Sequence, residues 1–350
     1  MLALNSRYEI IGTGLGGGMG DITICRDKNL DRRVVVKTLK PGQDDRRLLD
    51  ERKALLKLRS KHVVQLHDIL QLANPEFGHA IVLEYIEGRD LDVGQFPAAL
   101  EHLRVIWQIA CGLLAIHEQN IIHRDIKHNN IRLDNSGVVK ILDFGLARTA
   151  GPDAKTLSAI GTPGFMAPEL WTTRNVSFDK SIDVYAFAVT AILLHTPDLP
   201  PELEHWPPQP IMPRQLGAYL PHVPGEILQL LEAALSHDPL QRPKINEIEL
   251  LLRRHLLQNQ HRGLLVLGNE IHEVHAQSPA VTVRSADRGA LGIKYDGTKF
   301  IVSSVTGNVA VNNLPARVDQ ELPDCCVIAF GIEPNRKFVT FDVSNPEVMS

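Results

Sequence analysis

The chain is poor in cysteine, carries no excess of basic charge and lacks a long unbroken apolar run. Its four cysteines include no C-x-x-C pair, and Cys325 and Cys326 are adjacent, which favours reduced thiols over a disulfide framework. A formal net charge of −4 argues against a nucleic acid as the main ligand. The longest apolar stretch, around Tyr185 to Leu194, is shorter than the roughly 20 residues of a membrane helix. No signal peptide is recognisable. We therefore expect a cytoplasmic protein without a membrane or nucleic-acid partner.

The distribution of apolar residues predicts a strand-rich lobe over residues 1–87. Runs of β-branched residues flank a glycine-dense turn within residues 8 to 40, and a helical pattern follows from Asp44 to Arg59. Further strands are expected at Val63-Val64 and from Ala80 to Leu83. The lobe should therefore be a small sheet with one helix.

Helical patterns dominate residues 88–260, which we expect to form a second lobe. The helix predicted from Ser181 to His195 is almost wholly apolar and should lie at the centre of that lobe. The other predicted helices run from Leu103 to His117, Gly225 to Leu235 and Ile245 to Leu257. Short strands then alternate with turns from residue 264 to 350, which predicts a separate β module. The predicted fold class is α+β, followed by a small all-β module.

Proline crowds the stretch from residue 196 to 224 inside the second lobe. Because proline lacks a backbone donor and fixes φ, we expect an extended surface segment with no regular helix through it. Two interpretations stay open. The stretch is either a long connector or a docking surface for a partner protein, with Trp206 as its apolar anchor.

One loop and the motif that follows it carry most of the chemistry. His123-Arg124-Asp125-Ile126-Lys127-His128-Asn129-Asn130 is followed, thirteen residues later, by Asp143-Phe144-Gly145. Asp125 can orient an attacking hydroxyl and take its proton, while Asn130 and Asp143 offer hard oxygens to Mg²⁺. Lys127 can neutralise charge that builds on a γ-phosphoryl group. Together these residues predict phosphoryl transfer from ATP.

A glycine-dense turn and a strand-end lysine precede this loop. Glycines at residues 12 to 20 let backbone amides approach phosphates without a Cβ in the way. Lys37 can pair with α- and β-phosphates, and Glu51 lies one helix later as its expected partner. Taken singly, a glycine run can be a flexible turn and a strand-end lysine is usually solvated. The order of strand, glycines, strand and lysine is what favours a nucleotide site.

These motifs resemble those of bacterial-type serine/threonine protein kinases over roughly residues 8 to 257. The loop matches the pattern H-R-D-L-x-x-x-N, with Ile126 in the leucine position, and D-F-G follows it. The resemblance implies a two-lobed protein-kinase fold, ATP and Mg²⁺ as cofactors, and protein substrates with serine or threonine acceptors. Lys127 is typical of serine/threonine rather than tyrosine kinases.

The resemblance also implies a set of nucleotide-binding positions. Leu83 would line the back of the adenine pocket, and the Glu84 carbonyl and the Ile86 amide would hydrogen-bond adenine; an ordinary strand and turn is the alternative. Leu15 stands where the first glycine of G-x-G-x-x-G-x-V is expected, so the turn can lie differently over the nucleotide. The implied positions are Leu15, Gly16, Gly17, Gly18, Met19, Gly20, Ile22, Val35, Lys37, Leu83, Glu84, Ile86 and Asp143.

The segment from Asp143 to Glu169 resembles a kinase activation segment. Thr162 would contact Asp125 and Lys127. Thr156 and Ser158 are the expected autophosphorylation sites, because Arg124 holds a phosphorylated segment in related kinases; plain loop hydroxyls are the alternative.

Three further positions carry structural expectations from the resemblance. Glu169 should form an ion pair with Arg242 beneath the substrate shelf. Asp183 should brace the backbone of the catalytic loop. His128 stands where proline is usual, and we interpret it as a loop substitution rather than a proton-transfer group.

The β module resembles a forkhead-associated domain, a β-sandwich that binds phosphothreonine. The family's serine falls on Asp287, its histidine on Ala290, and its Asn-Gly pair reads Gly307-Asn308. An aspartate at a phosphate site would repel the ligand. We therefore favour a module that packs on the kinase or binds a protein over one that binds phosphopeptides. The resemblance lies in residues 287–290, 300–302, 307–312, 322–324 and 327–331.

Two rivals to an active protein kinase remain. In one, the chain is a kinase-shaped scaffold whose nucleotide site is only a switch. In the other, it phosphorylates a small molecule through the same catalytic loop. The joint presence of Lys37, Glu51, Asp125, Asn130 and Asp143 argues against the scaffold. The stretch from residue 161 to 169, which resembles a peptide platform, argues against a small-molecule acceptor.

Overall fold

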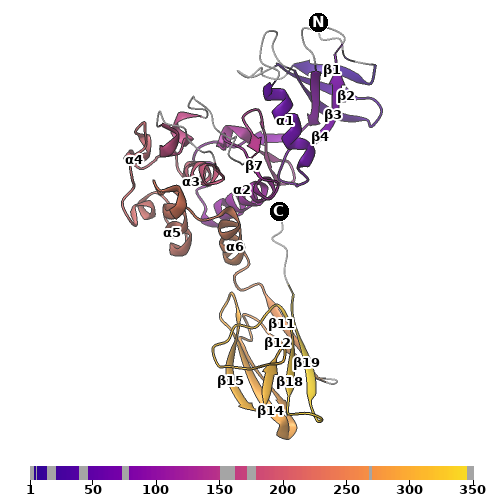
Figure 1. Ribbon diagram of the computed structural model, residues 1–350, viewed down its shortest axis with the longest axis vertical. Helices are drawn as coiled ribbons and strands as arrows, with labels where there is room; N and C mark the ends of the chain where they lie inside the picture. Colours follow the sequence, from indigo (N-terminus) through magenta and orange to yellow (C-terminus); the bar gives the residue numbers. More distant parts are fainter. Residues whose placement is uncertain are drawn as a thin grey trace. The chain divides into compact units, whose positions relative to one another are not determined.

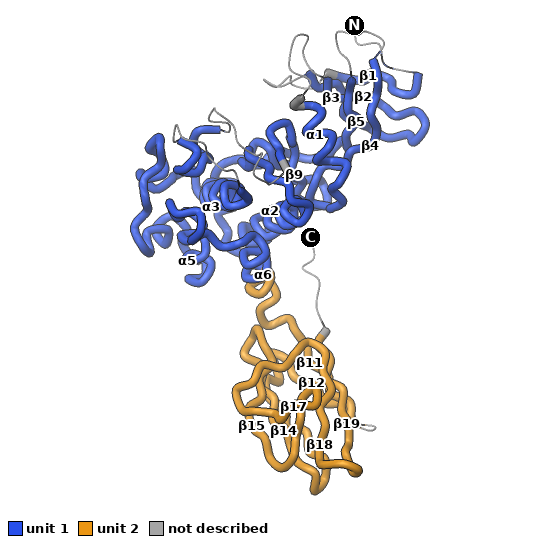
Figure 2. Tube along the Cα trace, in the orientation of Figure 1, with its two compact units in different colours: residues 1–252, 350 blue, residues 253–349 orange. Residues whose placement is uncertain are grey.

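The computed structural model describes residues 4, 6–13, 21–38, 46–72, 79–149, 162–171, 179–267 and 270–344. The chain divides into two compact units between Leu252 and Arg253 (Figure 2). The first unit contains a strand-rich lobe and a helical lobe, and the second is built largely of strands (Figure 1).

The first lobe is a five-stranded antiparallel sheet with one helix, α1 (Arg46–Lys57), after its third strand. The strand order is β1-β2-β3-β5-β4. Because side chains alternate along a strand, Val34 and Val36 of β3 enter an apolar core on one face, while Lys37 lies on the other face, toward α1. The strands are β1 Tyr8–Thr13, β2 Asp21–Asp27, β3 Arg32–Thr38, β4 Leu66–Gln71 and β5 His79–Glu84.

One strand of this sheet differs from the sequence-based expectation. Val63 makes a single parallel bridge with Ile141 instead of starting a strand. The strand in this part of the chain is instead β4, whose sequence shows no clean alternation of apolar and polar residues. Its pairing with β5 shifts register between Leu66 and Asp68. The irregularity hides this strand in the sequence.

The second lobe is organised around α3 (Ser181–His195), in which every residue from Ile182 to His195 is buried. A longer helix, α2 (Ala99–Glu118), packs against α3 and against the strand β9 (Val139–Ile141). Gly112 permits the close approach to β9, because a Cβ there would lie 2.7 Å from Ile141 Cδ1. The other helices described in this lobe are α4 Pro201–Glu204, α5 Gly225–Ala234 and α6 Ile245–Leu256.

By length and composition alone, α2 is long and apolar enough to cross a membrane, a property that no unbroken apolar run marks in the sequence. Polar residues such as Arg104 and Gln108 interrupt its apolar runs and obscure its length in the sequence. Within the unit, 61% of its most apolar window is buried, as in the core helix of a soluble domain.

Two small sheets fix the loops that carry the sequence motifs. The first has the order β6-β8-β9, and the second pairs β7 with β10. The catalytic-loop motif therefore begins directly after β7 and reaches β8 through a 3₁₀ turn at His128–Asn130. Asp143 follows β9 closely. These strands are β6 Gly88–Asp90, β7 Ile121–Ile122, β8 Ile131–Asp134, β9 Val139–Ile141 and β10 Arg148–Thr149.

The proline-rich segment is less extended than its composition predicts. It contains the short helix α4, with Pro201 at the first helical position, where proline is well tolerated. Leu203 and Leu216 are buried, so part of the segment packs into the lobe. Trp206 is 65% exposed and stacks on Trp171, with ring centroids 6.1 Å apart.

The second unit contains a six-stranded sheet of order β12-β11-β19-β18-β16-β17 and a three-stranded sheet of order β13-β14-β15. Side chains from both sheets, including Val283, Phe300, Ile328 and Phe341, form one apolar core. Strands β11, β12, β14 and β17 were not expected from the sequence. The strands are β11 Arg262–Leu267, β12 Glu270–Val274, β13 Ala280–Ser285, β14 Gly289–Tyr295, β15 Phe300–Gly307, β16 Val309–Val311, β17 Leu314–Pro315, β18 Cys325–Phe330 and β19 Lys337–Ser344.

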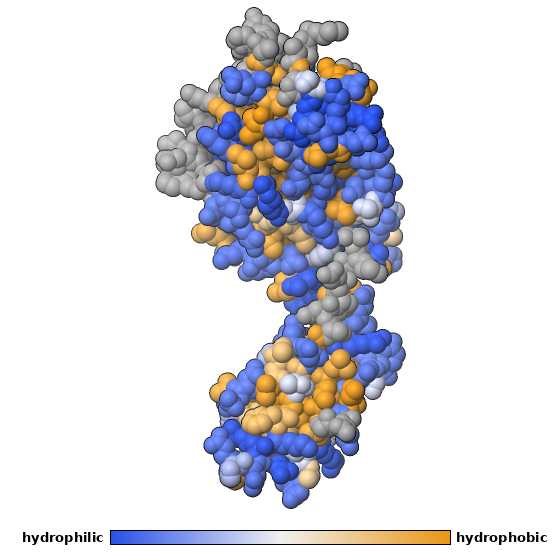
Figure 3. Space-filling view, turned by 90° about the vertical axis from the view of Figure 1, so that its right-hand side faces the viewer, coloured by the Kyte–Doolittle hydropathy of each residue, from blue (hydrophilic) through white to orange (hydrophobic). Residues whose placement is uncertain are grey.

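The six-stranded sheet also exposes apolar side chains. Val266 of β11 pairs with Ile271 of β12, and they are 45% and 67% exposed. Val327 of β18 and Phe338 of β19 are 42% and 58% exposed. Apolar side chains gather on the face of this unit that Figure 3 displays.

Candidate active site

Three charged side chains meet where β3, α1 and the residues after β9 come together. Lys37 Nζ lies 2.8 Å from Glu51 Oε2 and 2.9 Å from Asp143 Oδ1. Lys37 and Glu51 are buried, whereas about a third of the Asp143 side chain (32%) is exposed. The structure thus brings together a lysine and two carboxylates that the sequence separates widely, and leaves one carboxylate open to a ligand.

The pKa shifts of Lys37 and Asp143 favour their charged forms, whereas burial raises the pKa of Glu51. Burial alone would lower the pKa of Lys37, but the nearby charges of Glu51 and Asp143 outweigh it and raise that pKa. Burial alone would raise the pKa of Asp143, but the charge and hydrogen bond of Lys37 lower it. Both groups are therefore ionised at neutral pH.

Asp183 of α3 holds the start of the catalytic loop. Its carboxylate accepts hydrogen bonds from the backbone N–H groups of His123 and Arg124, both at 2.8 Å, and from His117 Nε2 at 2.9 Å. Burial would raise the pKa of Asp183, but the bond from His117 and neighbouring positive charge lower it. Arg124 has φ +71°, a left-handed conformation that is uncommon outside glycine and occurs often at functional sites. The contact with Asp183 stabilises this backbone.

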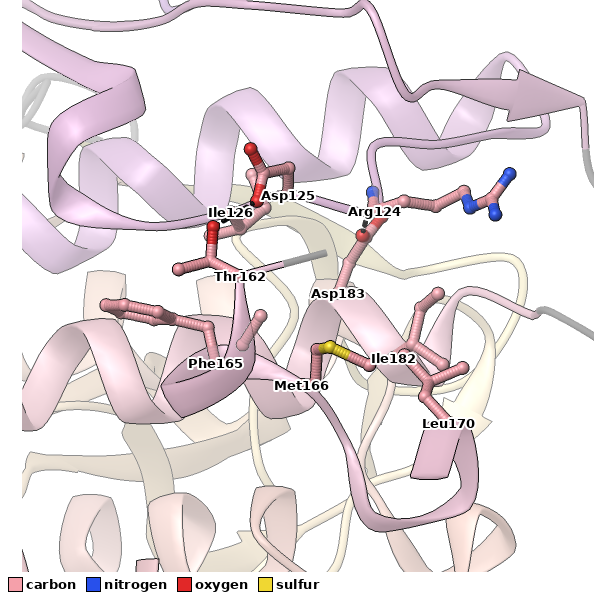
Figure 4. Close-up of a pocket in the computed structure, with 10 residues that line it drawn as sticks. Arg124, Asp125, Ile126, Thr162, Phe165, Met166, Leu170, Ile182 and Asp183 are labelled. Carbon is pink, nitrogen blue, oxygen red and sulfur yellow. Dashed lines mark hydrogen bonds between the residues drawn. The ribbon is translucent and has the colours of Figure 1, made fainter. Parts of the chain in front are cut away.

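Asp125 is the centre of a polar cluster, and Figure 4 shows it beside Thr162. Its Oδ1 accepts the hydroxyl of Thr162 at 2.8 Å. Its Oδ2 accepts Lys127 Nζ at 2.9 Å and Asn130 Nδ2 at 2.8 Å. Lys127 also donates to Thr162 Oγ1 at 2.5 Å. One carboxylate therefore binds a hydroxyl, an ammonium and an amide at the same time.

Asn130 and Asp143 suit a magnesium ion. Asn130 Nδ2 donates hydrogen bonds to the backbone oxygen and to the carboxylate of Asp125. The side-chain amide oxygen of Asn130 is left as an acceptor for a metal ion. Together with the part-exposed carboxylate of Asp143, this gives the hard oxygen ligands that Mg²⁺ prefers. Within the described residues, no group of three or more His, Cys, Asp or Glu side chains could hold a metal by itself. A site with few protein ligands is expected where Mg²⁺ is also bound by substrate phosphates.

The end of β5, at Glu84, is held in place by a residue of the second lobe. Lys140 of β9 donates to both carboxylate oxygens of Glu84, at 2.7 and 3.0 Å. The backbone N–H of Glu84 bonds to the Gln65 carbonyl at 2.9 Å. Leu83 and Ile86, the neighbouring positions implied for adenine, are buried. Their backbone is thereby fixed relative to β9.

Glu169 and Arg242 form a bidentate ion pair. Both guanidinium nitrogens, Nη1 and Nη2, lie 2.7 Å from a carboxylate oxygen of Glu169. Arg242 also donates to the Ser181 carbonyl, which ties the end of the segment at residues 162–171 to α3. The His128 ring packs on Phe165 of the same segment, with centroids 5.7 Å apart, and burial lowers the pKa of His128.

Several predicted positions lie outside the described residues. They are the glycine-turn positions Leu15, Gly16, Gly17, Gly18, Met19 and Gly20, and the expected phosphosites Thr156 and Ser158. Ile22 and Val35 lie on β2 and β3, where they are half-buried.

Sequence reasoning missed three supporting contacts. His117 binds Asp183, Lys140 binds Glu84, and Arg148 forms an ion pair with Asp50. Neither periodicity nor motif spacing marks these residues, because each contact joins segments that only the tertiary fold brings together. The one sequence signal for any of these contacts was that Asp50 directly precedes Glu51, the expected partner of Lys37.

The chain is similar to known proteins over its first unit. Residues 6–250 match the family model described as the protein kinase domain. The serine/threonine-protein kinase drp72 of Corynebacterium efficiens is 32% identical over 251 residues, which cover 65% of this chain and 46% of that protein.

Two other relatives show the same pattern. PknA of Corynebacterium glutamicum is 31% identical over 261 residues, covering 67% of this chain and 53% of that protein. PrkC of Bacillus subtilis is 27% identical over 260 residues, covering 68% and 39%. The chain thus spans about half the length of these relatives, or less.

Proposed function

The chain belongs to the protein kinase family, and from this premise we propose that it transfers the γ-phosphoryl group of ATP to serine or threonine hydroxyls of proteins. The observation that carries the proposal is the cluster at Asp125, whose carboxylate binds a threonine hydroxyl and a lysine together. A carboxylate in that position can align an acceptor hydroxyl and receive its proton.

In the proposed step the acceptor oxygen bonds to the γ-phosphorus. The bond from that phosphorus to the β-phosphate oxygen breaks, ADP leaves, and the hydroxyl proton passes to Asp125. Lys127 would neutralise charge on the transferred group. Asn130 and Asp143 would hold Mg²⁺, which when bound supplies positive charge against the phosphate oxygens.

The remaining residues of the cluster would position the nucleotide. Lys37, held by Glu51, would pair with the α- and β-phosphates, and the glycine-rich turn would cover them. Leu83, Ile22 and Val35 would line the adenine pocket, with hydrogen bonds from the Glu84 carbonyl and the Ile86 amide. Catalysis would come mainly from positioning and fixed charge, with no covalent intermediate.

The acceptor is proposed to be a protein hydroxyl because of the segment at residues 162–171. Its 3₁₀ turns at Pro163–Phe165 and Pro168–Trp171 are held by Asp125 and Arg242, which makes a fixed shelf beside the catalytic carboxylate. A small-molecule acceptor would not require such a shelf. We further propose autophosphorylation on Thr156 or Ser158, which phosphopeptide mapping tests; label confined to other regions would contradict it.

Incubation with γ-labelled ATP and Mg²⁺ tests the proposal. We expect wild type to label itself or a test protein on serine or threonine, and Lys37→Ala and Asp143→Asn to label about 100-fold less. Phosphoamino-acid analysis would identify the acceptor. If wild type and both variants are equally silent while partner binding persists, the scaffold interpretation replaces this one.

For the second unit we propose a forkhead-associated-like sandwich that binds a protein without requiring a phosphate. The exposed apolar residues Val266, Ile271, Val327 and Phe338 support a protein-binding face. Phosphothreonine peptides should bind no better than their unphosphorylated forms. The proline-rich segment, through Trp206, is a second proposed partner surface.

A cytoplasmic location is proposed because ATP is the cosubstrate and the cysteines form no disulfide among the described residues.

A further inference from the structure

Helix α1 carries two consecutive carboxylates with different partners. Glu51 is buried and binds Lys37 of β3. Asp50, whose side chain is 26% exposed, forms an ion pair with Arg148 of β10. Neighbouring residues on a helix point about 100° apart, so these two contacts hold α1 on two sides. The first contact belongs to the nucleotide site, and the second does not.

Arg148 connects α1 to the catalytic loop. It pairs with Ile122 in the two-stranded sheet of β7 and β10, and the loop begins at the next residue, His123. The same Nη1 that contacts Asp50 also lies 3.1 Å from the Ala147 carbonyl, which fixes the direction of the side chain. A shift of α1 away from the second lobe would therefore break an ion pair at the base of the loop.

Arg124 lies two residues after Ile122, the strand partner of Arg148, and its guanidinium is a second positive charge within electrostatic range of Asp50. Its side chain is directed away from Asp125 (Figure 4). Burial lowers its pKa to about 10, the charge of Arg148 lowers it too, and Asp183 and Asp50 act in the opposite direction. Two guanidiniums in a partly buried place repel each other, and the Asp50 carboxylate offsets that repulsion.

We propose that Asp50 is a positioning residue that balances Arg124 and Arg148 and so keeps α1, with Glu51, at Lys37 without a phosphate on the activation segment. This inference rests on the proposed kinase activity. Arg148 is already paired with the Asp50 carboxylate. An incoming phosphate would meet a like charge, and would have to displace Asp50 to bind.

The kinetic test uses the full chain after phosphatase treatment. Asp50→Asn should lower kcat/KM for ATP about tenfold, which corresponds to the loss of one part-buried ion pair. Asp50→Glu should recover most of this loss. Asp31→Asn is the matched control, because Asp31 is an exposed carboxylate paired with Arg26 in the β2–β3 turn. The kcat/KM of this control for ATP should equal that of wild type.

A double variant separates this role from general damage. If Asp50 acts through Arg148, the double variant Asp50→Asn, Arg148→Gln should lose no more kcat/KM for ATP than the more impaired of the two single variants. Additive losses would overturn the proposal. Loss of wild-type activity on phosphatase treatment to the level of Asp50→Asn would overturn it as well.

Hydrogen exchange of the α1 amides gives a readout that does not depend on catalysis. In the nucleotide-free, dephosphorylated protein, residues 46–57 should exchange faster in Asp50→Asn than in wild type or Asp31→Asn. Equal exchange in all three proteins would overturn the proposal. If wild type transfers no phosphate at all, the proposed function fails, and this comparison still decides whether Asp50 anchors α1.

Discussion

The two units of this protein treat polar side chains in opposite ways. The first unit buries Lys37, Glu51, Asp125, Asn130 and Asp183, and each has charged or hydrogen-bonding partners. In the described part of the second unit, the buried polar side chains reduce to Ser285. Burying charge costs free energy even when it is paired, and an apolar core suffices to hold a domain together. The contrast therefore locates the chemistry in the first unit.

The largest expected effect is on activity and comes from one buried carboxylate. Asp125→Asn keeps the shape of the side chain but removes the group that orients and deprotonates the acceptor. We expect phosphate transfer to fall by about 10²- to 10⁴-fold. Labelled-ATP assays measure the loss, and circular dichroism checks that the fold is retained. Activity within a few-fold of wild type would remove Asp125 from the mechanism.

Substitutions in the core of the second unit should affect stability rather than catalysis. Phe341 is fully buried, and Phe341→Ala should destabilise that unit by about 3–5 kcal/mol. Phe338 lies on the same strand but is 58% exposed, so Phe338→Ala should change stability by less than about 0.5 kcal/mol. Calorimetric unfolding of both variants distinguishes them. A loss of kinase activity in Phe338→Ala at unchanged stability would show that the units are functionally coupled.

Lowering the pH should reduce the free energy of unfolding of the first unit, because this unit buries a neutral histidine. Burial lowers the pKa of His102 to about 4, and its ring bonds the Ala191 carbonyl at 2.7 Å. Between pH 6.5 and 4 the unfolded chain binds a proton at this residue that the folded chain does not. Stability therefore rises with pH in this window.

The expected size follows from that pKa. Lowering the pH from 7 to 5 should reduce the free energy of unfolding by about 2 kcal/mol through His102. His102→Gln should remove this part of the pH dependence, whatever its own stability at pH 7. Denaturant unfolding at the two pH values measures it. An unchanged pH dependence in the variant would mean that His102 does not titrate as a buried group.

Local motifs made the chemical centre predictable. Asp125, Lys127 and Asn130 lie within one loop, and the order of strand and helix led to the expectation that Lys37 would meet Glu51. Resemblance led to the expectation of the distant pair Glu169 and Arg242, for which the sequence offers no spacing rule. Their geometry is present in the structure. Their catalytic roles stay predictions, as do the glycine turn and the phosphosites.

Contacts that depend on tertiary packing escaped the sequence. Asp50 and Arg148 are 98 residues apart, and Lys140 and Glu84 are 56 apart, with no repeat or pattern that pairs them. Strand β4 was hidden by its register shift, and α4 by the prolines around it. In each case a neighbour distant in sequence decides the conformation, so the local signal is weak or misleading.

The central claim is that the buried charges of the first unit are arranged to hold a magnesium nucleotide. Thermal unfolding with a non-hydrolysable ATP analogue tests it most directly. At 100 times its dissociation constant, the analogue with Mg²⁺ should stabilise the first unit of wild type by about 2.7 kcal/mol. The Mg²⁺-dependent part of this stabilisation should vanish in Asp143→Asn. No stabilisation of wild type, or an equal Mg²⁺-dependent gain in Asp143→Asn, would contradict the account.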